Sequence, residues 1–186
     1  MSLRSLSVLI QALALLTAAT AQVKSHHEAP LPLRATHPAM ELQQEGRITY
    51  LAQRITPPLR IALTHNGAYP QALNPPFAAK LIEEKPGYFL IFTDSFASNP
   101  GNIQGHCGAS LTGERYLHVV SLGEQPRETA SLLVESCLLN IVPAHAPHWD
   151  APAKTLTIDF LSNAKGPLHV VYQVAADGTV RETPAK

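Results

Sequence analysis

Residues 168–183 read LHVVYQVAADGTVRET, and this stretch decides the fold class. Two runs rich in β-branched residues, Leu168–Ala175 and Thr179–Thr183, flank the tripeptide Ala-Asp-Gly at 176–178. Asp-Gly is the pair best able to adopt the two positive φ values of a tight hairpin turn. The sequence therefore predicts that the chain ends in a β-hairpin.

The segment before this hairpin also has a strand pattern. In Thr155–Leu161, the apolar residues Leu156, Ile158 and Phe160 alternate with polar residues. Strict alternation is typical of a strand that buries one face and leaves the other in water. We expect this segment to pair in the same antiparallel sheet as the hairpin.

Upstream of residue 155 the chain contains further short apolar runs bounded by glycine and proline. We expect strands at Arg47–Gln53, Leu59–Thr64, Lys80–Glu84, Tyr88–Phe96 and Tyr116–Leu122, with a Pro-Gly turn at 85–87 joining the third and fourth. Thr129–Ile141 fits a strand or a helix, and a short helix is predicted around Met40–Glu45. The predicted fold is mainly β: an antiparallel sheet or sandwich of short strands, preceded by a proline-rich segment. A β-rich α+β fold is the alternative.

The N-terminus has the pattern of an export signal. Arg4 precedes an apolar run from about Leu6 to Ala18, and the small residues Ala19 and Ala21 suit a signal peptidase. We expect a signal peptide at 1–21, a flexible proline-rich leader at 22–38, and a single β-rich domain at 39–186. The apolar run is too short for a transmembrane helix, so we predict an extracytoplasmic protein, periplasmic or secreted, without an integral membrane segment after cleavage.

The charged side chains of this protein are balanced and give little indication of a charged partner. The whole chain has 14 basic and 14 acidic side chains, and removal of 1–21 takes away only Arg4. Lysines and arginines are scattered singly, whereas a nucleic-acid binder needs a basic patch. We therefore expect no nucleic-acid partner, and no sequence feature indicates a cofactor or an oligomeric state.

Cys107 and Cys137 are the only cysteines. In an exported chain, two cysteines favour one intramolecular disulfide, which would stabilise the fold by about 3–4 kcal/mol in the chain-entropy model. The alternative is an exported hydrolase in which Cys107 or Ser110 is the nucleophile and His106, His118 or His65 is the base. The local sequence lacks the last glycine of the nucleophile-elbow pattern, so a structural bridge is the favoured interpretation.

The segment HAPHWD at 145–150 is the densest cluster of metal-ligand residue types. Its candidate ligands are His145, His148 and Asp150, since imidazole and carboxylate suit zinc or a similar ion. Prolines around this segment instead favour a solvated loop anchored by Trp149. His26-His27-Glu28 could also bind metal, but in the leader such binding would be adventitious.

The remaining acidic and aromatic residues do not identify a reaction. Asp94, Asp150 and Asp159 are isolated in the sequence, and the aromatic residues of Tyr88–Phe96 are interpreted as core. The favoured hypothesis is a small, exported, non-catalytic binding protein: an accessory, inhibitor or immunity-type factor for another envelope or extracellular protein. An exported hydrolase is the first alternative, and a metal-binding protein using His145 and His148 is the second.

Overall fold

The computed structural model describes residues 31–32 (backbone only), 40–46, 48–53, 58–65, 76–97, 113–163 and 166–183. All regular structure within these ranges is β. The strands are β1 (Leu31–Pro32), β2 (Met40–Glu45), β3 (Ile48–Gln53), β4 (Leu59–Ala62), β5 (Ala78–Lys85), β6 (Phe89–Phe96), β7 (Glu114–Ser121), β8 (Arg127–Ser136), β9 (Ile141–Pro143), β10 (His148–Asp150), β11 (Thr155–Asn163), β12 (His169–Val174) and β13 (Val180–Thr183).

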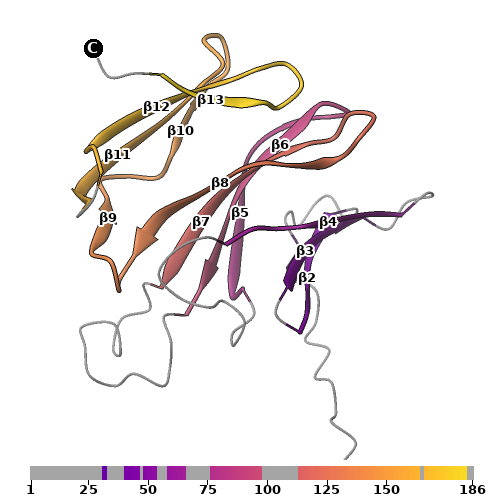
Figure 1. Ribbon diagram of the computed structural model, residues 1–186, viewed down its shortest axis with the longest axis horizontal. Coiled ribbons are helices and arrows are strands. Elements are labelled where there is room, and N and C mark those ends of the chain that lie inside the picture. The colour runs from indigo at the N-terminus through magenta and orange to yellow at the C-terminus, as the bar shows by residue number, and fades with distance from the viewer. Residues whose placement is uncertain are drawn as a thin grey trace, which may run out of the picture.

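The strands form two antiparallel sheets. The smaller sheet has the order β1-β2-β3-β4, and the larger one has the order β13-β12-β11-β9-β8-β7-β6-β5, with β10 paired to β11. Figure 1 shows the long strands β5–β8 in the middle, β2–β4 on one side of them, and β10–β13 on the other. The short strand β9 lies where the larger sheet bends away from β8 toward β11.

Strand β6 is buried at every position because both faces of the central strands β5–β8 are covered. On one face, Leu90 and Phe92 of β6 pack with Leu42, Leu51 and other apolar residues of the smaller sheet. On the opposite face, one core cluster joins the central strands to the C-terminal strands; it includes Phe89, Ile91, Leu117, Val119, Val134, Leu156, Ile158 and Val174. The described residues therefore form three β layers with two apolar cores between them.

The predicted mainly β fold with a C-terminal hairpin is confirmed. The strands β12 and β13 pair in antiparallel register from Val171↔Thr183 to Val174↔Val180. Leu156 and Ile158 are buried, as the alternating pattern of β11 predicted. The aromatic residues of β6 belong to the cores, although Tyr88, just before the strand, is exposed.

The predicted helix at Met40–Glu45 is wrong, because these residues form β2. Met40 and Leu42 alternate with polar neighbours and are buried against the central sheet, which is a strand pattern rather than a helical one.

The segment Thr129–Ile141, left open between strand and helix, is the strand β8 up to Ser136, followed by a turn and β9. Asn140 in that turn has a φ of 52°, in the left-handed region that asparagine tolerates better than most residues. The segment HAPHWD, interpreted as a loop, contains the short strand β10. Leu31–Pro32 pairs with β2, while the other residues of the predicted signal peptide and leader lie outside the described ranges.

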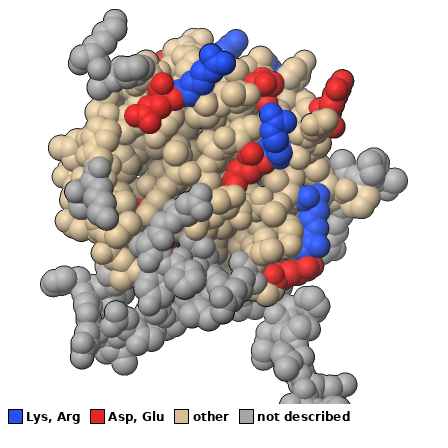
Figure 2. Space-filling view, viewed as in Figure 1, with Lys and Arg blue, Asp and Glu red and all other residues tan. Residues whose placement is uncertain are grey.

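Neither sign of charge dominates the described residues on the face drawn in Figure 2. Figure 2 shows lysine and arginine side chains interspersed with aspartate and glutamate over the face drawn there. Among the described residues, no helix is long and apolar enough to cross a membrane.

Two turn glycines differ in their surroundings. Gly87 and Gly178 have φ values of +75° and +83°, where a residue with a Cβ is strained. A Cβ on Gly87 would meet no atom within 4 Å, whereas one on Gly178 would lie 2.9 Å from the Phe89 Cβ. The C-terminal hairpin turn therefore packs directly against the central sheet, while the turn at Gly87 projects away from it.

We predict that Gly87→Ala lowers the free energy of unfolding by about 1–2 kcal/mol, which is the backbone penalty alone. Gly178→Ala should cost this amount plus about 1–3 kcal/mol for the forced overlap with Phe89. Urea denaturation of both variants measures the difference. Equal losses would contradict the close packing of this turn on the central sheet.

Candidate functional site

A cluster of charged side chains lies inside the molecule, between the smaller sheet and the central strands. Asp94 in β6 and His118 in β7 project from the same face, because Asp94 pairs with Tyr116 and His118 with Phe92 in the strand register. Phe92 and Val120, which flank His118 across and along the strands, belong to the apolar core on this face. The polar pair is therefore set within an apolar layer.

The third member, His65, comes from the other sheet. It lies just after β4, in the segment Leu63–His65 that crosses from the smaller sheet to the central one. The amide of Leu63 donates to the Thr49 carbonyl in the smaller sheet. The Thr64 carbonyl accepts a hydrogen bond from the Ser131 hydroxyl in β8. This segment is thus attached to both sheets by its backbone.

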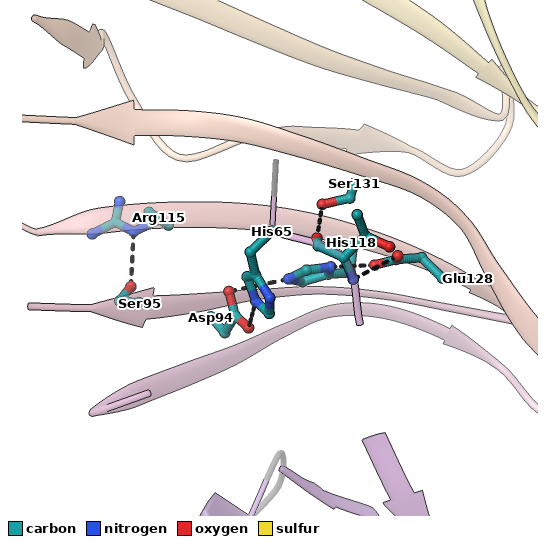
Figure 3. A network of polar contacts seen from close by, with 8 residues as sticks. His65, Asp94, Ser95, Arg115, His118, Glu128 and Ser131 are labelled. Atoms are coloured by element: carbon teal, nitrogen blue, oxygen red, sulfur yellow. Dashed lines mark hydrogen bonds and ion pairs between the residues drawn. The ribbon is translucent and has the colours of Figure 1, made fainter. Parts of the chain in front are cut away.

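Glu128 of β8 completes the cluster. Its Oε1 lies 2.6 Å from the Nδ1 of His118, and its Oε2 accepts a 2.8 Å hydrogen bond from the Thr64 amide. One carboxylate therefore contacts His118 and the residue next to His65. Figure 3 shows these contacts and the imidazole rings directed toward Asp94.

Asp94 lies between the two histidines. The Nε2 of His65 is 2.8 Å from Asp94 Oδ2, and the Nε2 of His118 is 3.1 Å from Asp94 Oδ1. The side chains of Asp94 and His118 have no exposed surface, and that of His65 is 4% exposed. His65 also packs edge-on against Phe96 and Tyr116, so aromatic rings exclude water from the cluster.

The carboxylates determine the charge state of this site. Burial lowers the pKa of His118, but Asp94 and Glu128 outweigh it and raise the pKa to about 9. Burial raises the pKa of Asp94, and the two histidines reverse this effect and hold it below its usual range. Without any bound ion, His118 therefore stays protonated at neutral pH, between the carboxyl groups of Asp94 and Glu128.

Two atoms in this cluster lack a hydrogen bond despite complete burial: Asp94 Oδ1 and His118 Nε2. They are 3.1 Å apart, close enough for an ion pair, but they are not aligned as donor and acceptor. Buried polar atoms without hydrogen bonds are rare in folded proteins. Their position next to His65 Nε2 makes this the one group among the described residues whose ligand atoms, all within 4.8 Å of one another, could hold a metal ion.

The sequence-predicted catalytic residues are only partly described. His106, Cys107 and Ser110 lie outside the described residues, so the hydrolase alternative stays a prediction. His118, offered as a base for that chemistry, instead lies in the Asp94 cluster together with His65. Cys137 follows β8 and is not a free cysteine, and its predicted bridge to Cys107 stays a prediction.

The sequence-predicted metal ligands lie elsewhere. His145 is exposed, with its Nε2 3.4 Å from Asp159 Oδ2, while His169 Nδ1 contacts the other oxygen of Asp159 at 2.6 Å. His148 and Asp150 are the ends of β10. The structure therefore brings His145 toward Asp159 rather than into a group with His148 and Asp150, and metal binding there stays a prediction.

Sequence reasoning missed Asp94 and Glu128 as members of a site. Asp94 was set aside as isolated, because its partners are remote in the sequence. One signal was available: Asp94 closely follows the apolar run 89–92, and His118 lies inside the apolar run 117–120. A charge in such a run requires compensation from another element.

Comparison with known proteins adds no further guidance. No protein-family model matches the chain, and neither the curated proteins nor the solved structures contain a match.

We predict that Asp94→Asn in metal-free buffer lowers the free energy of unfolding by about 3–5 kcal/mol. The change leaves His118 buried without its main counter-charge. The matched control is Asp159→Asn, which removes an aspartate that also contacts two histidines but at the surface, where solvent screens the pairs. Chemical denaturation should show a large loss for the first variant and little change for the second. Similar losses would show that burial is not what makes Asp94 important.

Proposed function

We propose that this protein binds a divalent transition-metal ion through His65, Asp94 and His118. The observation that carries the proposal is the pair of unsatisfied buried atoms, Asp94 Oδ1 and His118 Nε2, next to the Nε2 of His65. A metal ion would satisfy both atoms at once, whereas the present geometry gives neither a hydrogen bond.

The spacing of these atoms supports this proposal. Zinc binds imidazole nitrogen and carboxylate oxygen at about 2.0–2.2 Å, so two adjacent ligands of an octahedral or tetrahedral ion lie about 2.8–3.6 Å apart. Asp94 Oδ1 and His118 Nε2 are 3.1 Å apart. A small adjustment of His65 around Asp94 would bring a third ligand to the same ion.

The chemistry of the ligand set favours particular ions. Two imidazoles and one carboxylate suit zinc and the neighbouring late first-row ions, whereas calcium and magnesium prefer oxygen ligands. Glu128 contacts the Nδ1 of His118, which leaves Nε2 directed at the site. This arrangement, a carboxylate behind a metal-binding histidine, is the usual outer-shell partner of such ligands.

The rival explanation is a structural ion network, in which protonated His118 bridges two carboxylates without any metal. It accounts for the charges but leaves Asp94 Oδ1 and His118 Nε2 poorly aligned inside an apolar core. Metal binding accounts for both, because the metal replaces the proton on Nε2 and balances the same carboxylates.

We predict that the full-length protein, stripped with a chelator, binds one equivalent of Zn²⁺ or Co²⁺. His65→Gln and His118→Gln should each weaken binding at least about 100-fold, because each removes one of three protein ligands. Calorimetric titration gives the stoichiometry and affinity. Visible absorption of bound Co²⁺ shows whether nitrogen and oxygen ligands surround the ion.

The control variant is His169→Gln, in which the surface pair with Asp159 is lost and the buried cluster is intact. A second control replaces His26 and His27 with alanine to remove the predicted adventitious site. Both controls should retain the wild-type stoichiometry. If the chelated protein takes up no metal, or if metal binding disappears only in the controls, the proposal is wrong and the buried cluster is an ion network.

The expected role outside the cytoplasmic membrane, with another envelope or extracellular protein as partner, remains a separate proposal. It is supported by the export pattern at 1–21 and by the balanced charge of the chain. We predict that affinity capture from envelope extracts with the mature protein recovers a specific partner. Repeated recovery of none would count against a partner-binding role and would leave the metal proposal unaffected.

A further inference from the structure

The metal ligands come from two different sheets. Asp94 and His118 belong to the central strands β6 and β7, whereas His65 follows β4 of the smaller sheet. A metal ion that binds all three would therefore form a link between the two sheets.

Glu128 is placed to organise this link before any ion binds. Its two oxygens divide their contacts: Oε1 holds His118 Nδ1 at 2.6 Å, and Oε2 accepts from the Thr64 amide at 2.8 Å. The first contact orients a ligand from the central sheet. The second fixes the backbone next to the ligand from the smaller sheet.

Other attachments of this segment are few in the described chain. Beyond Glu128, the Ser131 hydroxyl donates to the Thr64 carbonyl, and Leu63 contributes to the apolar core. His65 itself reaches the central sheet through Asp94 Oδ2 and through its ring contacts with Phe96, Tyr116 and His118. Residues 63–65 thus contribute both to the docking of the smaller sheet, beside its apolar core with the central strands, and to the assembly of the ligand set.

We propose that Glu128 is a positioning residue that couples metal binding to the docking of the β2–β4 sheet on the central strands. This inference rests on the proposed metal site. Metal binding stabilises the docked arrangement because undocking removes His65 from the ion. Conversely, docking raises the metal affinity because it supplies the third ligand already oriented.

The effect on docking has a predictable size. An ion that binds only the docked state suppresses undocking by a factor of about 1 + [metal]/Kd, which is about 100 when the free metal is 100 times Kd. Amide hydrogen exchange in β2–β4 should slow by up to this factor if these amides exchange through undocking. Exchange in β12 and β13, which pack on the opposite face, should change little.

The variant that tests the positioning role is Glu128→Gln. Its side-chain amide retains one oxygen that can accept from His118 Nδ1, but it presents an NH₂ group to the Thr64 N–H, so two donors face each other. We expect metal affinity to fall by about 10–100-fold, as for loss of an outer-shell carboxylate. The absorption spectrum of bound Co²⁺ should also change, because the constraint on His118 and His65 is altered.

The matched control is Glu135→Gln. Glu135 lies on the same strand and forms an ion pair with Arg115 at 2.9 Å, away from the cluster. It should retain wild-type affinity and the wild-type Co²⁺ spectrum. Ser131→Ala serves as a milder variant that removes the other side-chain attachment of Thr64, in case Glu128→Gln does not fold.

The experiment is hydrogen exchange on the full-length protein with and without saturating Zn²⁺. The coupling is supported if metal slows amide exchange in β2–β4 of the wild-type protein and of Glu135→Gln. In Glu128→Gln or Ser131→Ala at equal metal saturation, this slowing should be smaller. If the metal binds stoichiometrically but exchange in β2–β4 is unchanged, the coupling is wrong and the metal site stands. If no metal binds, the proposed function fails, and this inference fails with it.

Discussion

The structure depends on covering both faces of β6 and β7. Every residue of β6 is buried, so each of its side chains must be apolar or must find a partner within the protein. The smaller sheet covers one face and the C-terminal strands cover the other. Asp94 and His118 point toward the smaller sheet. The smaller sheet and the segment after it must therefore supply polar partners for these buried charges as well as apolar surface.

The two faces of the central strands meet this requirement differently. On the side of the C-terminal strands, Phe89, Ile91 and Val119 join an apolar core, and the buried polar residues Thr93 and Ser95 that follow in β6 are uncharged. On the side of the smaller sheet, apolar packing is interrupted by Asp94 and His118. Loss of one buried ionic partner costs far more than loss of one methylene group. The docking of the smaller sheet is therefore selective for the position that brings His65 and Thr64 to the cluster.

Much of the fold could be predicted from the sequence because its signals are local. The alternating residues Leu156 and Ile158 predict a single strand, and the Asp-Gly turn at residue 177 predicts the pairing of two neighbouring strands. The strand at Met40–Glu45 was missed because only Met40 and Leu42 carry its alternation, and two apolar residues are too few to distinguish a strand from a helical turn. Segment Thr129–Ile141 was ambiguous because β8 is partly buried at most positions, so its apolar residues follow neither period cleanly.

The candidate site could not be predicted because its geometry is non-local. His65 and Asp94 are 29 positions apart in the chain, and their contact exists only because the segment after β4 crosses onto the central sheet. The dense cluster at 145–150 attracted attention instead, since adjacency in the sequence was the only measure of proximity available. In the structure, His145 and His148 are exposed, whereas the buried cluster is formed by residues that are far apart in the sequence.

The comparison of the two His–Asp–His arrangements shows why burial decides their roles. Asp159 contacts His145 and His169 in much the same way as Asp94 contacts His65 and His118. At the surface, water can complete any unsatisfied hydrogen bond and screens the charges, so the arrangement needs no ion. Inside the apolar layer, water is excluded, so Asp94 Oδ1 and His118 Nε2 can be satisfied only by each other or by a cation that displaces the His118 proton. The same residue types therefore form a screened surface ion pair in one place and, in the other, the buried charged cluster that we propose as a ligand set.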